Sequence, residues 1–277
     1  MTYTLTFVAA NNDLKIEQLN EIYQGQYEWL VADKAAQANI NSALSIDEIK
    51  RHRETLAAHK IDIFCTPHDF KAKLFLADMD ATIVTTETLD ELAAEAGIKD
   101  QIAAITQRAM KGELDFHAAL KERVGLLKNL PEDAIKRTLD DTQISKGAKT
   151  LLRTLKHNNI HTVLVSGGFT YFTNAVAKQL SFDNNHGNQL DIQDGKLTGN
   201  VIEPILDKDA KLAYLNHYAQ EKNINISDTV AIGDGANDLP MLEAAGLGVG
   251  YQPKPLVADS ILNCIIHTDL ETVCFLL

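Results

Sequence analysis

The stretch LFLADMDAT, residues 74–82, decides the fold of this chain. Its first four residues form an apolar run bounded by polar ones, which is typical of a buried strand in a parallel sheet. The two acids that follow, Asp78 and Asp80, stand two positions apart, so both leave the strand end on the same side. Burying two like charges this close is costly unless a cation or a proton compensates them. The pair therefore predicts chemistry, with one carboxylate as nucleophile and metal ligand and the other as proton carrier; an acidic loop that caps a helix is the alternative.

Two further strand ends carry polar residues in the same way. Residues 161–165 (HTVLV) are rich in strand formers and lead into Ser166-Gly167-Gly168, and residues 229–232 (TVAI) lead into GDGAND at 233–238. Between them, Lys211 lies early in a helical pattern over residues 207–221. Ligands of open α/β sheets bind at the carboxyl ends of the strands, so we expect these residues to form one site.

From residue 73 onward, strand patterns alternate with helical ones, which predicts an α/β fold with a Rossmann-like, doubly wound parallel sheet. One segment interrupts the alternation, because residues 86–141 contain four helical patterns in succession and no strand pattern. A helical insert directly after the first strand predicts a cap over the site, at about residues 85–145. A β-hairpin is expected within residues 188–199, with Asp194-Gly195 as its turn.

Residues 1–72 are predicted to form a separate small α/β module. The pattern favours the order β-α-β-α-β, with strands near residues 4–8, 27–31 and 61–65 and a helix that begins at the cap residue Ser45. This order is similar to a shortened ACT-type regulatory module, and a plain dimerisation or stability domain fits equally well. Residues 67–73 would be a short linker to the second unit, residues 73–277.

The composition limits the class of protein and its partners. Hydrophobic residues make up 45% of the 277 residues, enough for a sizeable core. A net charge of −12 without a basic run argues against nucleic acid or an anionic membrane as partner. Three cysteines without a CxxC pair fit a reducing compartment. No signal peptide or membrane span is evident, so we expect a cytoplasmic protein.

The ordered motifs resemble those of the haloacid dehalogenase superfamily of phosphohydrolases. The sequence is similar in particular to the phosphoserine phosphatase family, through five segments over residues 73–277: VTTETLDE at 84–91, Arg123-Val124, VSGGF at 165–169, DGKLTG at 194–199 and GDGAND at 233–238. The resemblance implies hydrolysis of O-phospho-L-serine to L-serine and phosphate, the last step of L-serine biosynthesis, through an aspartyl-phosphate intermediate.

The resemblance also implies roles for individual residues. Asp78 would be the nucleophile, Asp80 the general acid and base, and Lys211 a fixed cation beside them. Asp78, Asp234 and the backbone carbonyl of Asp80 would hold Mg²⁺, which prefers oxygen ligands. Asp238 would orient Lys211 or a metal-bound water.

A second group of residues would bind the small-molecule substrate. Ser166, Gly167 and Asn237 would hold the phosphate, helped by a helix N-terminus. In the cap, Glu87 would accept the ammonium group of phosphoserine, and Arg123 would bind its α-carboxylate, which suits a planar guanidinium.

Three questions stay open at this stage. Ala81 stands where the family usually carries Ser, so a hydroxyl contact to phosphate is lost, although the backbone N–H at this position could still donate. The alternatives to the hydrolase are a phosphotransferase or a phosphatase for another small phosphate, and an amino-acid sensor without activity. The oligomeric state, a homodimer included, does not follow from the sequence.

Overall fold

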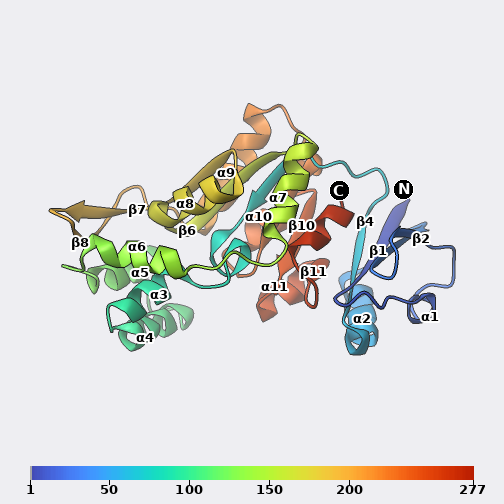
Figure 1. Cartoon of the computed structure of the whole chain (residues 1–277), viewed down its shortest axis with the longest axis horizontal. Coiled ribbons are helices and arrows are strands. Elements are labelled where there is room, and N and C mark those ends of the chain that lie inside the picture. The colour runs from blue at the N-terminus through green and yellow to red at the C-terminus, as the bar shows by residue number, and fades with distance from the viewer. Residues whose placement is uncertain (1) are drawn as a thin grey trace.

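The computed structural model describes residues 2–277, apart from the side chains of Met110 and Lys208. Residues 2–67 form a four-stranded antiparallel sheet with two short helices (Figure 1). Its elements are β1 (Tyr3–Ala9), α1 (Ile16–Leu19), β2 (Glu28–Val31), β3 (Ala35–Ile40), α2 (Ile46–Leu56), the 3₁₀ turn η1 (Ala57–His59) and β4 (Ile61–Pro67), and the strand order is β2-β3-β1-β4.

The expected order β-α-β-α-β is wrong in one respect, because β3 was not foreseen. Its sequence AAQANI is mostly alanine and polar residues, which carry little strand propensity. Tertiary context overrides this propensity: β3 lies between β1 and β2 and is antiparallel to both, and its alanines at positions 35 and 36 are fully buried. Whether residues 1–72 are a separate domain stays a prediction.

The larger sheet has seven strands in the order β11-β10-β9-β5-β6-β7-β8. All neighbours are parallel except β7 and β8, which form the expected hairpin. The strands are β5 (Leu74–Ala77), β6 (His161–Phe169), β7 (Asn184–Gln193), β8 (Lys196–Ile202), β9 (Thr229–Gly233), β10 (Leu247–Tyr251) and β11 (Asn263–Ile265). The predicted α/β fold with a largely parallel central sheet is thereby confirmed.

Helices cover both faces of this sheet (Figure 1). Alternate residues of β5 face opposite ways: Phe75 and Ala77 join one apolar cluster with α7 and α8, whereas Leu74 and Leu76 join another with α9 and α10. These helices and turns are α7 (Ala148–His157), α8 (Thr170–Leu180), α9 (Lys208–Glu221), η3 (Ile226–Asp228), α10 (Leu239–Ala244), α11 (Pro255–Ser260) and η4 (Leu270–Phe275). Among the described residues, no helix is long and apolar enough to cross a membrane.

Four helices leave the sheet directly after β5, close to their predicted positions: α3 (Thr88–Glu95), α4 (Lys99–Met110), α5 (Phe116–Gly125) and α6 (Glu132–Asp141). The chain enters this cap after the turn η2 (Met79–Ile83) and returns beside its own entry, where Val84 and Ile144 form an antiparallel bridge. The hairpin β7-β8 contacts the cap through its backbone. The Leu197 N–H donates to the Leu130 carbonyl at 2.9 Å, and the Leu197 carbonyl accepts from the Asn129 N–H at 2.8 Å. Figure 1 places α3 and α4 far from the N-terminal sheet along the long axis.

Polar side chains join the two sheets where β4 meets β11. Asp62 on β4 is 2% exposed, and its carboxylate accepts hydrogen bonds from the backbone N–H groups of residues 266–268 and from the Thr268 hydroxyl at 2.7 Å. The Asn263 amide bridges to the backbone of Cys65, accepting from its N–H at 2.8 Å and donating to its carbonyl at 3.2 Å. The N-terminal sheet is therefore fixed to the edge of the larger one.

Substitution Asp62→Ala should lower the free energy of unfolding by roughly 1.5–3 kcal/mol, because several backbone donors lose a buried, charged acceptor. The matched control is Asp259→Ala, which removes an exposed carboxylate that pairs with Lys50 across the same seam. That pair should contribute less than about 1 kcal/mol. Denaturant unfolding of both variants measures the difference, and equal effects would contradict the role of Asp62 as the main polar join.

Candidate active site

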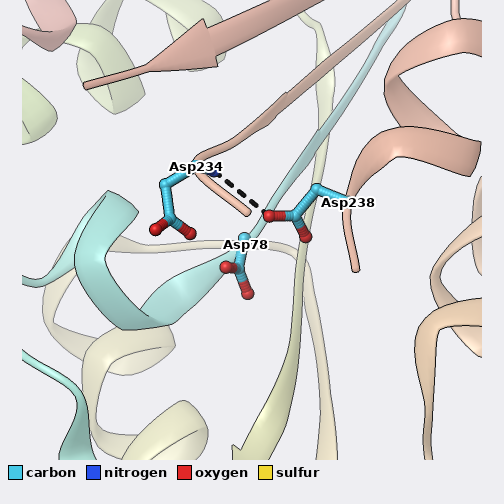
Figure 2. Close-up of side chains that lie close together, drawn as sticks. All are labelled: Asp78, Asp234 and Asp238. Atoms are coloured by element: carbon cyan, nitrogen blue, oxygen red, sulfur yellow. Dashed lines mark hydrogen bonds between the residues drawn. The ribbon is translucent and has the colours of Figure 1, made fainter. Parts of the chain in front are cut away.

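The site forms where three neighbouring strands end. Asp78 directly follows β5, Asp234 directly follows β9, and Ser166 lies within β6, so the parallel register brings them to one edge of the sheet. The Asp78 N–H donates to the Ile232 carbonyl at 3.0 Å, which continues the ladder between β5 and β9 into the site. Figure 2 shows the carboxylates of Asp78, Asp234 and Asp238 turned toward a common space.

A buried lysine neutralises part of this acidic cluster. Lys211 is 1% exposed, and its ammonium donates to Asp78 Oδ1 at 2.6 Å and to Asp238 Oδ1. It lies in the first turn of α9, which begins where the Asp207 carboxylate accepts the backbone N–H groups of residues 209 and 210. The second oxygen of Asp238 accepts the N–H groups of Asp234 and Gly235, the first of which is drawn in Figure 2. Asp238 thus holds the acidic loop and Lys211 together.

The charged groups of this cluster shift one another's pKa values. Burial raises the pKa of Asp78, the Asp238 carboxylate raises it further, and the Lys211 ammonium opposes both. Burial disfavours the charge of Lys211, but the carboxylates of Asp238 and Asp78 outweigh it and raise the pKa of Lys211 above its ordinary value. Burial likewise raises the pKa of Asp234. Lys211 and the half-exposed Lys254, which lies 2.9 Å from Asp234, bring two positive charges to three buried carboxylates, so the cluster favours a further cation.

The donor set fits a hard divalent cation. Asp78, Asp234 and Asp238 each offer a carboxylate oxygen, and these atoms lie within 4.8 Å of one another. Such an all-oxygen set suits Mg²⁺ or Ca²⁺ better than softer metals. The structure brings two of the three expected ligands, Asp78 and Asp234, together and adds the Asp238 carboxylate. The expected third ligand, the carbonyl of Asp80, stays a prediction.

Asp80 is oriented by the cap and by β6. Its Oδ1 accepts from the Thr88 N–H at 2.8 Å and from the Thr88 hydroxyl at 2.6 Å, at the first residue of α3. Its Oδ2 accepts from the Ser166 hydroxyl at 2.6 Å. The hydroxyl expected to hold phosphate is therefore engaged with Asp80 in this structure. Sequence reasoning missed Thr88, since a threonine at a helix start has an ordinary structural explanation.

The two glycines after Ser166 allow neighbouring side chains to lie close to the backbone of this loop. A Cβ on Gly168 would lie 2.8 Å from Asp80 Oδ2, so any larger residue would displace this carboxylate. A Cβ on Gly167 would lie 3.5 Å from the ring of Phe116, which shows that the cap helix α5 covers this loop. Asn237 is exposed at the rim of the acidic loop, where its amide lies 3.4 Å from Asp238 Oδ1.

The two residues expected to read the substrate's charges both lie in the cap. Glu87 precedes α3, and its Oε1 lies 3.4 Å from the ammonium of Lys254, which also lies 2.9 Å from Asp234 Oδ2. Arg123 is half-buried on α5; burial lowers its pKa, and the carboxylates of Asp90 and Glu87 oppose this shift. The carboxylates of Glu87 and Asp90 thus lie near enough to Arg123 to act on its charge. Lys254 was not foreseen, because it follows no motif.

Ala81 adopts a left-handed conformation, with φ 53° and ψ 7°. Its N–H donates to the Thr86 carbonyl at 3.2 Å, which closes the turn at the entry to the cap. The expectation that this N–H is free for phosphate does not hold in this structure, because the tight turn uses it.

A parallel sheet with carboxylates at neighbouring strand ends, a buried lysine and a helical cap defines an α/β enzyme of the hydrolase class. Residues 75–243 match the model of the haloacid dehalogenase-like hydrolase family, and the chain belongs to this family. It is 40% identical to the phosphoserine phosphatase of Archaeoglobus fulgidus over 213 residues, which are 76% of this chain and 62% of that protein. The chain thus spans less than two thirds of that relative.

Solved structures agree over different parts of the chain. A "HAD family hydrolase" from Salmonella enterica subsp. enterica serovar Typhi matches with a TM-score of 0.90 and 31% identity, covering 99% of this chain and 98% of that one. A structure of a phospho-aspartyl intermediate analogue of phosphoserine phosphatase matches with a TM-score of 0.70 and 38% identity, covering 75% of this chain and 99% of that one. The resemblance seen in the sequence is confirmed.

Substitution Ala81→Gly should raise the free energy of unfolding by about 1 kcal/mol, because a left-handed conformation strains any residue with a Cβ. Ala81→Ser restores the residue usual in the family but keeps the strain, so its stability should stay close to that of the parent. Denaturant unfolding of the three proteins tests this. A clear loss of stability in the glycine variant would show that the turn is not strained.

Proposed function

We propose that this protein is a phosphoserine phosphatase, which hydrolyses O-phospho-L-serine to L-serine and phosphate. The observation that carries the proposal is the buried array of Asp78, Lys211 and Asp238, placed beside Asp234 at neighbouring strand ends. The similarity to phosphoserine phosphatases over three quarters of the chain supports it.

Asp78 is the nucleophile in this mechanism. Its carboxylate attacks phosphorus, the bond from phosphorus to the serine oxygen breaks, and an aspartyl-phosphate forms. Asp80 gives its proton to the leaving serine oxygen and later takes a proton from the water that attacks the aspartyl-phosphate. That second attack breaks the bond between Asp78 and phosphorus and releases phosphate. The Ser166 hydroxyl can turn from Asp80 to the phosphoryl group. Gly167 and Asn237 would bind the same phosphoryl group.

Lys211 and the acidic loop set the charge of the site. Lys211 opposes the rise in the pKa of Asp78 that burial causes and offers a fixed positive charge to the phosphoryl oxygens. Asp78 and Asp234 would hold Mg²⁺, together with the carbonyl of Asp80 and with Asp238 beside them. When bound, Mg²⁺ supplies Lewis-acid stabilisation of the negative charge on the transferring group.

The cap supplies recognition of the amino acid. Glu87 accepts the substrate ammonium and Arg123 binds the α-carboxylate. Glu87 directly precedes α3 and Arg123 lies on α5, and α5 lies over the phosphate loop, as the ring of Phe116 beside Gly167 indicates. Leaving one of two such charges unpaired in a closed site costs roughly 2–5 kcal/mol, so a substrate without these groups should be bound less well.

Phosphate release from a panel of phosphorylated amino acids and sugars, with Mg²⁺ and with a chelator, tests the proposal. We expect O-phospho-L-serine to be the best substrate and activity to need the metal. Asp78→Asn should abolish turnover, because an amide is a poor nucleophile, and Asp80→Asn should lower it by roughly 10²–10⁴-fold. The control Asp194→Asn, at the distant hairpin turn, should behave like the parent. Near-normal turnover in Asp78→Asn would exclude the aspartyl-phosphate mechanism.

Glu87→Gln and Arg123→Ala should each lower kcat/KM for phosphoserine by roughly 30-fold or more, at about 1.4 kcal/mol per tenfold. An aryl phosphate lacks both recognised groups, so these variants should hydrolyse it about as well as the parent does. The controls are Glu91→Gln and Arg108→Ala, which change exposed charges of neighbouring cap helices.

Steady-state kinetics on both substrates separate the outcomes. Equal losses on the two substrates would mean that Glu87 and Arg123 serve cap folding instead of recognition. No loss on either would remove phosphoserine as the favoured substrate.

A further inference from the structure

Lys254 connects the acidic loop of the sheet to the cap. It lies in the segment between β10 and α11, and its backbone N–H donates to the Asp234 carbonyl at 2.8 Å, which fixes it over the acidic loop. Its ammonium lies 2.9 Å from Asp234 Oδ2 and 3.4 Å from Glu87 Oε1. One cation thus contacts two acids that belong to different parts of the fold.

The side chains of the two acids differ in their exposure to solvent. The Asp234 side chain is 8% exposed, whereas those of Glu87 and Lys254 are about half exposed. Water can therefore reach the ammonium, and Lys254 can leave its place without unfolding any element. A buried cation such as Lys211, which is 1% exposed, has no such freedom.

The other strong cation of the site is already engaged. Lys211 pairs with Asp78 and Asp238. Among the described residues, Asp234 and Glu87 form ion pairs with Lys254 alone. Lys254 is therefore the counter-ion of the two acids that, under the proposed function, bind the metal and the substrate ammonium.

We propose that Lys254 is a resident counter-ion that both ligands displace, so that it couples the divalent-cation site at Asp234 to the ammonium site at Glu87. The inference rests on the proposed function. A divalent cation at Asp234 repels the Lys254 ammonium, and because this single ammonium serves both acids, Glu87 is then released for the substrate. Binding of either ligand thereby favours binding of the other, as linkage requires.

Removal of the charge at position 254 tests the first half of this inference. Calorimetric titration of Mg²⁺ into the metal-stripped, substrate-free protein should show affinity about 3- to 10-fold higher for Lys254→Met than for the parent, since a screened like charge near the divalent ion is gone. Lys254→Arg keeps the charge and should match the parent. The control Lys73→Met removes an exposed lysine of similar exposure that pairs with Asp228, and should change nothing.

Unchanged or weaker Mg²⁺ binding in Lys254→Met would overturn the inference. Weaker binding would mean that Lys254 positions Asp234, and unchanged binding would make it an ordinary surface lysine. A thermal melt of the metal-free variant shows that it is folded before titration.

L-Serine, the product that carries the ammonium group, tests the coupling. In the parent, Mg²⁺ should raise the affinity for L-serine by about 3- to 10-fold, and L-serine should raise the affinity for Mg²⁺ by the same factor, because the two effects are linked. In Lys254→Met the metal-free protein should already bind L-serine more tightly, and the enhancement by Mg²⁺ should be lost. A full enhancement in this variant would overturn the coupling.

The two proposals fail in distinguishable ways. If the parent neither hydrolyses phosphoserine nor binds L-serine, the proposed function and the coupling both fall. Tighter Mg²⁺ binding by Lys254→Met would then still support displacement at Asp234, because that titration uses neither substrate nor turnover.

Discussion

The ion-paired array of Lys211 with Asp78 and Asp238 is the constraint on which the rest of the site depends. Three carboxylates at one sheet edge are 5% exposed or less, and burying them without compensation would cost more than a domain's whole stability. The parallel register of β9, β5 and β6 places the acids together, and the first turn of α9 brings the lysine to them. Even with Lys254 beside Asp234, the three carboxylates exceed the ammonium groups that pair with them. The close packing of buried carboxylates raises the free energy of the metal-free cluster, and for the same reason the cluster should bind a divalent cation strongly.

The cap is tied to this array through short polar contacts at its entrance. Asp80 is two residues beyond Asp78, yet one of its oxygens is held by Thr88 at the start of the first cap helix. The other oxygen is held by Ser166 from the sheet. Asp80, which we propose as the proton carrier, is thus hydrogen-bonded to both the cap and the sheet. Movement of the cap by even 1 Å would change its hydrogen bonds, which is a physical reason to expect proton transfer only when the cap is closed.

Strand ends could be predicted from the sequence because apolar runs and the polar residues after them are local signals. Asp78, Asp80, Ser166 and Asp234 all follow such runs, and the structure gathers them at one edge. Lys254 and Thr88 could not be predicted, since their contacts depend on how the loops fold back. Lys254 lies 20 residues from Asp234 and 167 residues from Glu87, and Thr88 lies 8 residues from Asp80. The strand β3 was missed for a related reason: its alanines carry no strand signal, and only burial between two other strands makes them extended.

The seam between the two sheets, where β4 meets β11, determines how the N-terminal sheet is connected to the acidic loop. Asp62 and Asn263 replace strand-to-strand pairing with side-chain hydrogen bonds to backbone groups, so β4 is attached to β11 without forming a continuous sheet. β11 pairs with β10, and the segment after β10 carries Lys254. Two short strands therefore connect the seam to the segment that carries Lys254. The strand β2 lies at the opposite edge of the N-terminal sheet, away from this seam.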